Sequence, residues 1–351
     1  MTNPAFPPIF DGHNDVLSLQ LKTGEGARKA FMDGNTAHID VPKAKIGGFG
    51  GGFFAIYIPS LGNFDHYYEM MQQPEYDLPL PDFVPFEVAK PIMLTQVDIL
   101  RQLESDGALK VCVTTSEIRD CLNTGLMAAI MHIEGAEGID ANLDMLGTMY
   151  ELGLRSLGPV WSRPTVFGHG VPFRYPSDGD IGAGLTNAGK DLVRECNRLG
   201  IMLDLSHLNA AGVRDIAKIS DAPLVATHSN CHAISPHARN LTDEQLAMIK
   251  DSDGMVGLNF AVAFLRPDGQ MQSDTGLDVM MRHLDHLITH LSEDRVGLGS
   301  DFDGAEMPDA IGDIAGLSNF RNAMRRHGIN DALMAKLCSD NWLAVLGRTW
   351  K

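Results

Sequence analysis

The sequence predicts an α/β protein: a distorted (β/α)8 barrel of the TIM type, formed as a single domain over residues 1–351. Short apolar runs alternate with helical patterns along the whole chain, as they do where helices connect parallel strands. Eight such runs are present, the number of strands that closes this kind of barrel. Five of them end in His, Asp or Glu side chains, which suits the catalytic end of a barrel.

Each predicted strand is a short apolar run bounded by turn residues. The strands are expected at 9–15, 51–58, 127–134, 154–160, 201–206, 223–228, 254–260 and 295–301. The helices between them carry apolar residues at i, i+3 and i+4, and several open with a capping residue such as Thr186, Asn209 or Thr242. They are expected at 92–104, 142–152, 186–199, 209–219, 242–250 and 276–291, with a closing helix at 331–348.

Two regions depart from this repeat. Residues 60–91 are rich in proline and aromatic residues, and they predict a long loop insertion over the barrel mouth or against a partner. Residues 107–123 predict a small extra strand and helix outside the barrel. The sequence shows no linker that would separate two domains, which favours a single one.

Composition narrows the classes of function. With 351 residues, 44% of them hydrophobic, the chain can bury a core that needs no disulfides. Its five cysteines are odd in number and form no CxxC pair, which favours a reducing compartment. The net charge of −17 argues against nucleic acid and anionic membranes as partners. The N-terminus lacks the pattern of a signal peptide and no apolar stretch reaches the ~20 residues of a membrane span, so we expect a cytoplasmic protein without membrane contacts.

Ligand-type side chains at the strand ends predict a metal centre. His13 and Asp15 lie two residues apart in DGHND, so on an extended strand they face the same side. Glu134 ends the run LMAAIMHIE, His207 ends IMLDLSH, and His228 follows PLVAT. Imidazole nitrogens and carboxylate oxygens are the ligands that zinc takes in hydrolytic enzymes. The sequence therefore predicts a hydrolytic metal centre.

Other residues compete for places in this centre. Glu137 is an alternative to Glu134, and His132 faces the same side of the strand as Glu134, where it could support the centre without binding metal. A second HxD pair, His38 and Asp40, follows no apolar run and is assigned a structural role.

The segment GSDFDG adds a further carboxylate. Asp301 is expected to bind metal or to carry a proton at the edge of the centre, and Asp303 to shape the loop. Two cations that share a hydroxide would give a strong nucleophile, because bound water has its pKa lowered from ~16 toward ~7. An amide hydrolase also needs a group that protonates the departing amine, and Asp301 suits that task.

The motifs of this chain resemble those of the membrane (renal-type) dipeptidases, metallopeptidase family M19, within the amidohydrolase-like barrels. The resemblance rests on DGHND, IEG, NRLGIMLDLSH, THSN followed by RNLTD, GSDFDG and the closing NWLAVLG, so it covers nearly the whole chain. It implies a zinc metallodipeptidase that hydrolyses free dipeptides and tolerates a D-residue at the C-terminal position, as in L-Xaa-D-Xaa dipeptides.

The resemblance also implies a role for each motif residue. Two zinc ions would be bound, one by His13 and Asp15 and the other by His207 and His228, with Glu134 bridging both at the catalytic centre. Asp301 matches the catalytic acid/base of the family. Arg239 matches an arginine that grips the C-terminal carboxylate of the substrate, with Asn240 beside it, and a guanidinium fork suits that contact.

The chain departs from the family pattern at Trp161. The family often has a histidine there, which contacts the substrate carbonyl. His169, in the following loop, is predicted to take over this substrate contact, and Arg163 is an alternative. If Trp161 forms an apolar wall instead, the substrate range should shift, or oxyanion stabilisation should come mainly from zinc.

Together these features predict a binuclear zinc dipeptidase that attacks a small dipeptide substrate with a metal-bridging hydroxide. The metal ligands alone leave open another amidohydrolase-type reaction, on a lactone or a cyclic amide, and the Arg-Asn pair favours dipeptides over it. A non-catalytic, zinc-stabilised binding protein is the alternative from a different class. We favour a homodimer, in which the Met- and aromatic-rich segment 60–91 packs on a second subunit.

Overall fold

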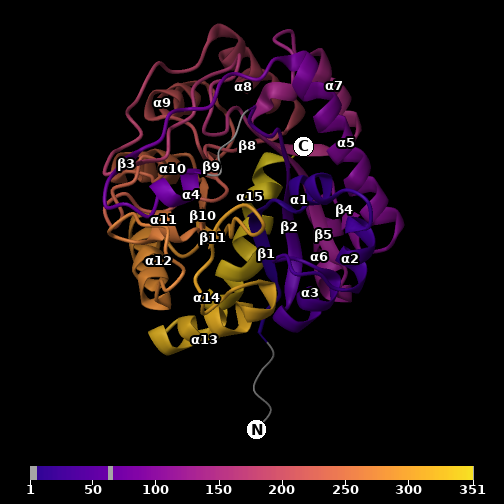
Figure 1. The fold of residues 1–351 in the computed structure, drawn as a ribbon, viewed down its shortest axis with the longest axis vertical. Helices are drawn as coiled ribbons and strands as arrows, with labels where there is room; N and C mark the ends of the chain where they lie inside the picture. Colours follow the sequence, from indigo (N-terminus) through magenta and orange to yellow (C-terminus); the bar gives the residue numbers. More distant parts are fainter. Residues whose placement is uncertain (1–5, 62–65, 351) are drawn as a thin grey trace.

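A computed structural model describes residues 6–61 and 66–350. Eight parallel strands form a nearly closed barrel surrounded by helices, which confirms the predicted fold (Figure 1). These strands are β1 (Ile9–Asn14), β2 (Phe49–Tyr57), β5 (Met127–Glu134), β6 (Leu154–Gly158), β8 (Met202–Leu203), β9 (Val225–Ala226), β10 (Met255–Leu258) and β11 (Val296–Leu298). They pair in the order β8-β6-β5-β2-β1-β11-β10-β9. The two ends of this order meet where Asp204, directly after β8, forms a parallel bridge to Val225 of β9.

The helices cover the outside of the barrel and its N-terminal end. They are α1 (Val16–Thr23), α2 (Ala27–Asp33), α3 (Val41–Gly47), α4 (His66–Met70), α5 (Phe86–Ser105), α6 (Thr115–Thr124), α7 (Asp144–Glu151), α8 (Asn187–Leu199), α9 (Ala210–Ile219), α10 (Asp243–Asp251), α11 (Val262–Leu265), α12 (Leu277–Leu291), α13 (Leu317–His327), α14 (Asp331–Ala335) and α15 (Asn341–Thr349). Short 3₁₀ turns lie at Ala136–Gly138 and Ile314–Gly316. Of these helices, α1, α2, α3, α11 and α13 lie outside every range that the sequence analysis predicts.

Several barrel strands are shorter than the sequence predicts, and β8 and β9 are the shortest of them. β8 and β9 have two residues each, where six are expected at 201–206 and 223–228. The reason is the side chain of Asp204, whose Oδ1 accepts the backbone N–H groups of Ser206 at 2.9 Å and Thr227 at 2.8 Å. Side-chain hydrogen bonds therefore replace the regular strand pairing at this point of the barrel.

The segment 60–91 differs from the single long loop that its composition predicts. It contains α4 and the strand β3 (Tyr76–Asp77), which pairs antiparallel with β7 (Arg174–Tyr175). Its last residues belong to α5, which begins at Phe86 and not at residue 92. The difference arises because Pro91, which normally disfavours a helix interior, lies inside this helix.

The extra element at 107–123 is attached to the barrel sheet. Its strand β4 (Leu109–Val111) pairs in parallel with β5, although it is not one of the eight strands in the barrel order. Its helix α6 begins at a capping box in which Thr114 and Glu117 bond each other's backbone N–H groups.

The closing helix predicted at 331–348 is interrupted. A π-helical turn at Lys336–Asp340 separates α14 from α15. Trp342 of α15 is fully buried, donates its indole N–H to Leu298 O at 3.0 Å, and packs on Phe53 with ring centroids 5.0 Å apart. The C-terminal helix therefore seals the end of the barrel opposite the site described below.

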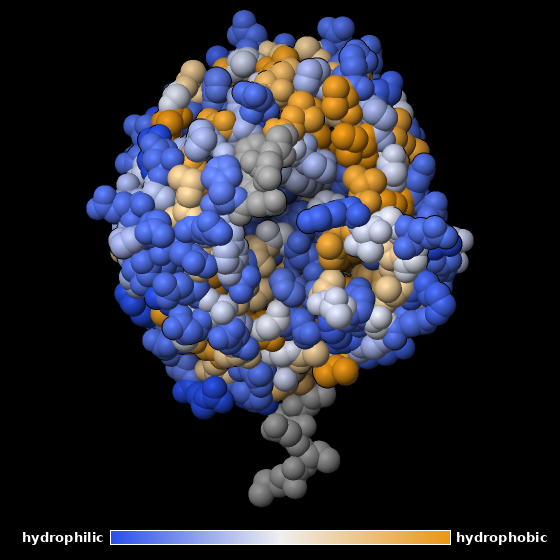
Figure 2. All heavy atoms as spheres, viewed as in Figure 1, coloured by the Kyte–Doolittle hydropathy of each residue, from blue (hydrophilic) through white to orange (hydrophobic). Residues whose placement is uncertain are grey.

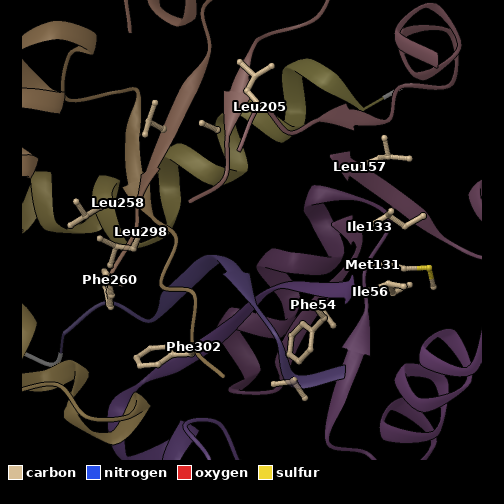
Figure 3. Packing of buried hydrophobic residues seen from close by; sticks show 14 of the residues in the cluster. Phe54, Ile56, Met131, Ile133, Leu157, Leu205, Leu258, Phe260, Leu298 and Phe302 are labelled. Atoms are coloured by element: carbon tan, nitrogen blue, oxygen red, sulfur yellow. The ribbon is translucent and has the colours of Figure 1, made fainter. Parts of the chain in front are cut away.

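Apolar side chains fill two regions. Phe54, Met131 and Leu157 belong to the cluster between strands and surrounding helices (Figure 3). A second cluster, which includes Ile130 and Trp342, lies inside the barrel. The two-residue periodicity of β5 places His132 and Glu134 on the same inner side as Ile130. The barrel interior is thus apolar near α15 and polar toward the C-terminal ends of its strands.

Hydrophilic side chains cover much of the face that Figure 2 shows. On the face that Figure 2 shows, hydrophobic side chains gather over α5 and α7, elements near which Val88 and Leu152 are exposed. Among the described residues, no helix combines the length and the hydropathy that crossing a bilayer requires.

Candidate metal centre

Six predicted ligand-type side chains meet at the C-terminal rim of the barrel. They are His13 in β1, Asp15 just before α1, Glu134 at the end of β5, His207 after β8, His228 after β9 and Asp301 after β11. All six are buried. They meet because parallel barrel strands all end on the same rim, so strand-end residues far apart in sequence become neighbours.

Glu134 lies at the middle of this group. Its Oε1 is 3.1 Å from His207 Nε2, 3.4 Å from His228 Nε2 and 3.6 Å from His13 Nε2. His13 Nε2 is also 3.4 Å from Asp15 Oδ2, and the Nε2 atoms of His207 and His228 are 3.1 Å apart. One carboxylate is therefore shared by two sets of ligand-type atoms.

These residues fit a pair of divalent cations. His13, Asp15 and Glu134 offer ligand atoms that all lie within 4.8 Å of one another, and so do Glu134, His207 and His228. Both ring nitrogens of His13 are buried without a hydrogen-bond partner, an unfavourable arrangement unless a ligand satisfies them. Imidazole nitrogens combined with carboxylate oxygens are typical of zinc sites.

Burial sets the charges in this cluster. It lowers the pKa values of His207 and His228 well below the usual range, so both rings are neutral, the form that binds metal. Burial raises the pKa of Glu134 well above its usual value, while the charge of His13 opposes that rise. Burial also opposes the charged form of His13, but Glu134 and Asp15 outweigh it and raise the pKa of His13 to about 10. The carboxylates of Glu134 and Asp15 therefore stabilise a positive charge that lies between them.

Hydrogen bonds behind His228 determine which of its nitrogens is free. Thr227 Oγ1 lies 2.5 Å from Asp204 Oδ2 and 2.8 Å from His228 Nδ1. A carboxylate can only accept, so the Thr227 hydroxyl donates its proton to Asp204. The same oxygen must then accept the Nδ1–H of His228. The lone pair of His228 is consequently on Nε2, the nitrogen that faces Glu134 and His207.

Neither Asp204 nor Thr227 is among the site residues that the sequence analysis predicts. Both lie within the motifs that contain the predicted ligands, three residues before His207 and one residue before His228. His207 has a comparable support, because its Nδ1 lies 2.8 Å from Ser162 Oγ. Hydrogen-bond partners on the ring nitrogen that does not bind metal commonly orient metal-binding imidazoles.

The two competitors of Glu134 have other partners. His132 Nδ1 is 2.9 Å from Ser156 Oγ, farther inside the barrel. Glu137 forms a buried ion pair with Arg163, whose Nη2 is 2.8 Å from Glu137 Oε1. Neither His132 nor Glu137 is in a potential metal group with the other site residues.

Asp301 lies at the edge of the cluster. Its ligand atom lies within 4.8 Å of those of His13 and His228. Its Oδ2 accepts the amide of Asn259 at 2.9 Å, and burial raises its pKa although His13 opposes that rise. A side chain at Gly304 would collide with Asp301, so glycine lets the loop close against the site. A carboxylate with a raised pKa is suited to carrying a proton.

Arg239 is buried near the same carboxylates. Glu134 and Asp301 both act electrostatically on its guanidinium. Its Nη1 donates to Ser229 Oγ at 2.9 Å and its Nη2 to His228 O at 2.8 Å, whereas its Nε has no partner. These bonds orient the guanidinium from behind and leave it further donor capacity.

Asn240, the second predicted substrate residue, holds the fold around Arg239. Its Nδ2 donates to Ser235 O at 2.9 Å and to Phe264 O at 2.8 Å. Its Oδ1 is buried without a partner. The amide nitrogen is therefore committed to the backbone, and only the oxygen is free to meet a ligand.

Trp161 forms a wall of the site. Its ring centroid lies 5.8 Å from that of His207 and 5.6 Å from that of Phe173. His169 is half-buried and is not among the residues that line the cavity beside Trp161. Arg163 donates to Glu137, Ser60 and Ile58, so it is occupied in the fold. The substrate contact expected of His169 stays a prediction.

A cavity of about 140 Å³ adjoins the cluster. Glu134, His207 and Asp301 line one part of it. Most of the remaining lining is apolar and includes Met71, Trp161, Phe173, Val262, Phe264 and Met271. Met71 comes from the segment 60–91, and its carbonyl accepts the N–H of Met271 at 2.8 Å. This segment therefore helps to close the cavity.

Comparisons with known proteins point to one family. The family model "Membrane dipeptidase (Peptidase family M19)" matches residues 5–350. A metallo peptidase from Rhodobacter sphaeroides, solved with a phosphinate mimic of the dipeptide L-Ala-D-Ala, is 55% identical; the match covers 99% of this chain and 100% of that chain, with a TM-score of 0.97. The dipeptidase AC, a metallo peptidase of family M19, is 54% identical over 99% of both chains, with a TM-score of 0.96. An uncharacterized protein of Klebsiella pneumoniae is 45% identical over 262 residues, 74% of this chain and 97% of its own length.

Proposed function

Because the chain belongs to Peptidase family M19, the membrane dipeptidases, and is a metallodipeptidase, we propose that it is a binuclear zinc enzyme that hydrolyses free dipeptides, including L-Xaa-D-Xaa dipeptides. One observation carries the proposal of two metals. Glu134 Oε1 lies between 3.1 and 3.6 Å from the Nε2 atoms of three histidines, in the manner of a carboxylate shared by two sites.

The ligands divide between two positions. His13 and Asp15 would hold one zinc ion, His207 and His228 the other, and Glu134 would bind both. When bound, the two cations would activate a water molecule near neutral pH and polarise the scissile carbonyl. The hydrogen bonds that His207 and His228 form with Ser162 and Thr227 keep both rings oriented for this task.

Two further residues would act on the substrate. Asp301, with its raised pKa, would hold the proton that the departing amine nitrogen needs. Arg239 would bind the C-terminal carboxylate, since a buried guanidinium attracts an anion strongly. The bonds of Arg239 to Ser229 and His228 support this role, because they hold the guanidinium in place before the substrate arrives.

The substrate proposal rests on a relative and on the cavity. The Rhodobacter sphaeroides protein was solved with a mimic of L-Ala-D-Ala, and the two chains share 55% identity over nearly their whole length. The cavity here, about 140 Å³ and largely apolar, has room for small apolar side chains. We therefore propose small side chains in the preferred dipeptides. His169 remains proposed as a substrate contact, and a homodimer remains a prediction.

A turnover screen combined with metal analysis tests this proposal. The enzyme would be supplied with zinc and offered matched L,L- and L,D-dipeptides, together with a lactone and a cyclic amide. We expect two zinc ions in the barrel centre and turnover of L,D-dipeptides with small side chains. The Glu134→Gln variant should lose both activity and zinc. Turnover of the lactone or cyclic amide with no dipeptide cleaved would overturn the substrate proposal, and full activity with one zinc ion in that centre would overturn the binuclear one.

A further inference from the structure

Three ligand-type side chains meet a second time, outside the barrel, where α10 and α12 lie side by side (Figure 1). Asp243 is the first residue of α10, and His286 and His290 lie on α12. The proposed dipeptidase mechanism uses none of them. Each side chain is partly exposed: the exposed fraction is 49% for Asp243, 20% for His286 and 34% for His290.

The fold brings the two histidines to the same partner. Met280, Leu284, Leu287 and Leu291 of α12 are buried, which fixes the rotation of the helix. His286 and His290, four residues apart, therefore lie one above the other on the side of α12 that meets α10. Their rings stack with centroids 4.3 Å apart and an interplanar angle of 24°.

The ligand atoms converge on the Asp243 carboxylate. His286 Nε2 lies 2.7 Å from Asp243 Oδ1, and His290 Nε2 lies 3.9 Å from Asp243 Oδ2. One ligand atom from each of the three residues lies within 4.8 Å of the other two. In a tetrahedral zinc site with bonds of ~2.0–2.1 Å, neighbouring ligand atoms are roughly 3.3 Å apart. Small side-chain rotations on a partly exposed surface would produce that spacing.

From this geometry we propose that Asp243, His286 and His290 form a separate binding site for a first-row transition-metal dication such as Zn²⁺. Two imidazole nitrogens and one carboxylate oxygen suit zinc, copper or nickel, whereas calcium and magnesium prefer oxygen ligands. Solvent water would complete the coordination, because all three side chains reach the surface.

A nearby pair shows what distinguishes this site from an ordinary surface contact. Asp285 of α12 pairs with His327 at 2.9 Å, which is a single histidine on a single carboxylate. That pair has no second histidine and belongs to no potential metal group among the described residues. The proposed site differs in its second imidazole, and chelation by two imidazoles from one helix is what would give it affinity for zinc.

A cation at this site would join α10 to α12 close to the segment that carries Arg239, the residue proposed to bind the substrate carboxylate. Asp243 follows Arg239 by four residues. On α12, His283 accepts the N–H of Cys231 at 3.2 Å and lies 2.9 Å from Leu265 O, so this helix already holds the segment between His228 and Arg239. We infer a bracing role for the cation and no role in the chemical step.

Titration of Zn²⁺ into the metal-loaded enzyme by calorimetry tests the site. We expect one binding event beyond the metals of the barrel. Changing His290→Ala should weaken this event by at least about tenfold, since even residues that only support metal ligands commonly matter by that much. Asp243→Asn should weaken it as well. His327→Ala, which removes the comparable pair on the same helix, should leave it unchanged. If His290→Ala and His327→Ala bound Zn²⁺ identically to the parent enzyme, the proposal would be wrong.

Thermal unfolding gives an independent measurement. Added Zn²⁺ should raise the Tm of the loaded parent enzyme and of His327→Ala, because a ligand that binds only the folded state stabilises it. The rise should be absent in His290→Ala, and dipeptide turnover of that variant should equal that of the parent. A rise of equal size in His290→Ala would place the added zinc elsewhere and overturn the assignment. The calorimetric titration and the Tm shift both measure Zn²⁺ binding at the surface site, so neither depends on whether the enzyme cleaves dipeptides.

Discussion

At the scale of single residues, the site depends on backbone conformations that most side chains avoid. His207 and Asp301 both have a φ of 66°, in the left-handed region. His and Asp tolerate this region better than most residues other than glycine, and such conformations gather at functional sites. In this chain they turn two strand-end residues toward the cluster around Glu134.

The role of Asp301 can be tested with Asp301→Asn. Without the carboxyl proton we expect kcat to fall by about 10²–10⁴-fold, the usual contribution of a general acid or base. Zinc content should be retained, because all five residues proposed to bind zinc remain. Glu306→Gln is the matched control, since Glu306 lines the same cavity in the same loop. Wild-type kcat in Asp301→Asn would exclude proton transfer by Asp301.

Arg239→Ala tests the carboxylate contact. The loss of a charge-assisted hydrogen bond worth about 1.5–3 kcal/mol should lower kcat/KM for free dipeptides by roughly 10–150-fold, mainly through KM. The same dipeptides with a C-terminal amide should show little change. Arg198→Ala, on the surface of α8, serves as control. An equal loss on acid and amide substrates would contradict the contact.

Thr227 tests the orientation of His228. Thr227→Val removes the hydroxyl that accepts the Nδ1–H of His228, so we expect zinc affinity to fall by about 10–100-fold in a chelator competition assay. Thr227→Ser keeps the hydroxyl and should remain close to the parent enzyme. If valine and serine gave the same affinity, the hydrogen bond would not orient His228.

At the scale of elements, the loops around the barrel rim are held by buried polar side chains. Arg163, which follows β6, reaches Ile58 O beyond β2 at 2.8 Å and Glu137 beyond β5 at 2.8 Å. Neither side chain of the Arg163–Glu137 pair is exposed. The Arg163 guanidinium therefore joins the ends of β2, β5 and β6, and β5 is the strand that carries Glu134.

Breaking this ion pair should be costly. Arg163→Met leaves Glu137 buried without a partner, and we expect the free energy of unfolding to fall by about 3–5 kcal/mol. Asp191→Asn, which breaks the exposed contact of Asp191 with Arg194, should cost less than about 1 kcal/mol. Denaturant unfolding of both variants with zinc bound provides the comparison, and equal effects would show that Arg163 is not a structural anchor.

At the scale of the whole molecule, negative charge is concentrated inside the barrel as well as on the surface. The chain has a net charge of −17, and the carboxylates of Asp15, Glu134 and Asp301 are buried together at the rim. Burial, and after it the charge of the neighbouring Asp15, raises the pKa values of Glu134 and Asp301, so their charged forms lack sufficient compensation from the protein. Cations in this cluster should therefore stabilise the fold as well as supply the chemistry.

Metal removal tests this coupling. Chelation should lower the Tm, and zinc should restore it, since a ligand at 1,000 times its Kd contributes about 4 kcal/mol to the folded state. Magnesium should not replace zinc at a site rich in imidazole. The measurement belongs in a His290→Ala background, so that the proposed surface site does not contribute. An unchanged Tm after complete metal removal would separate metal binding from stability.

Much of the fold was predictable because strands and helices follow the pattern of apolar residues along short stretches of sequence. Each of the eight predicted strand ranges overlaps a barrel strand, since runs such as LMAAIMHIE are apolar over the length of one strand. The prediction fails where side chains replace backbone bonds, as Asp204 does beyond β8, and where Pro91 lies inside a helix. Local patterns do not describe either situation.

The sequence by itself determined the barrel, the family motifs and the six residues expected at the rim, because strand periodicity and ligand type are properties of neighbouring residues. Only the tertiary structure decided that Glu134 rather than His132 or Glu137 meets three histidines, that Asp204 and Thr227 orient His228, and that His286 and His290 face Asp243. These contacts join residues that are distant along the chain, or depend on which way a side chain turns. They follow from how helices and strands pack, which a single segment of sequence does not specify.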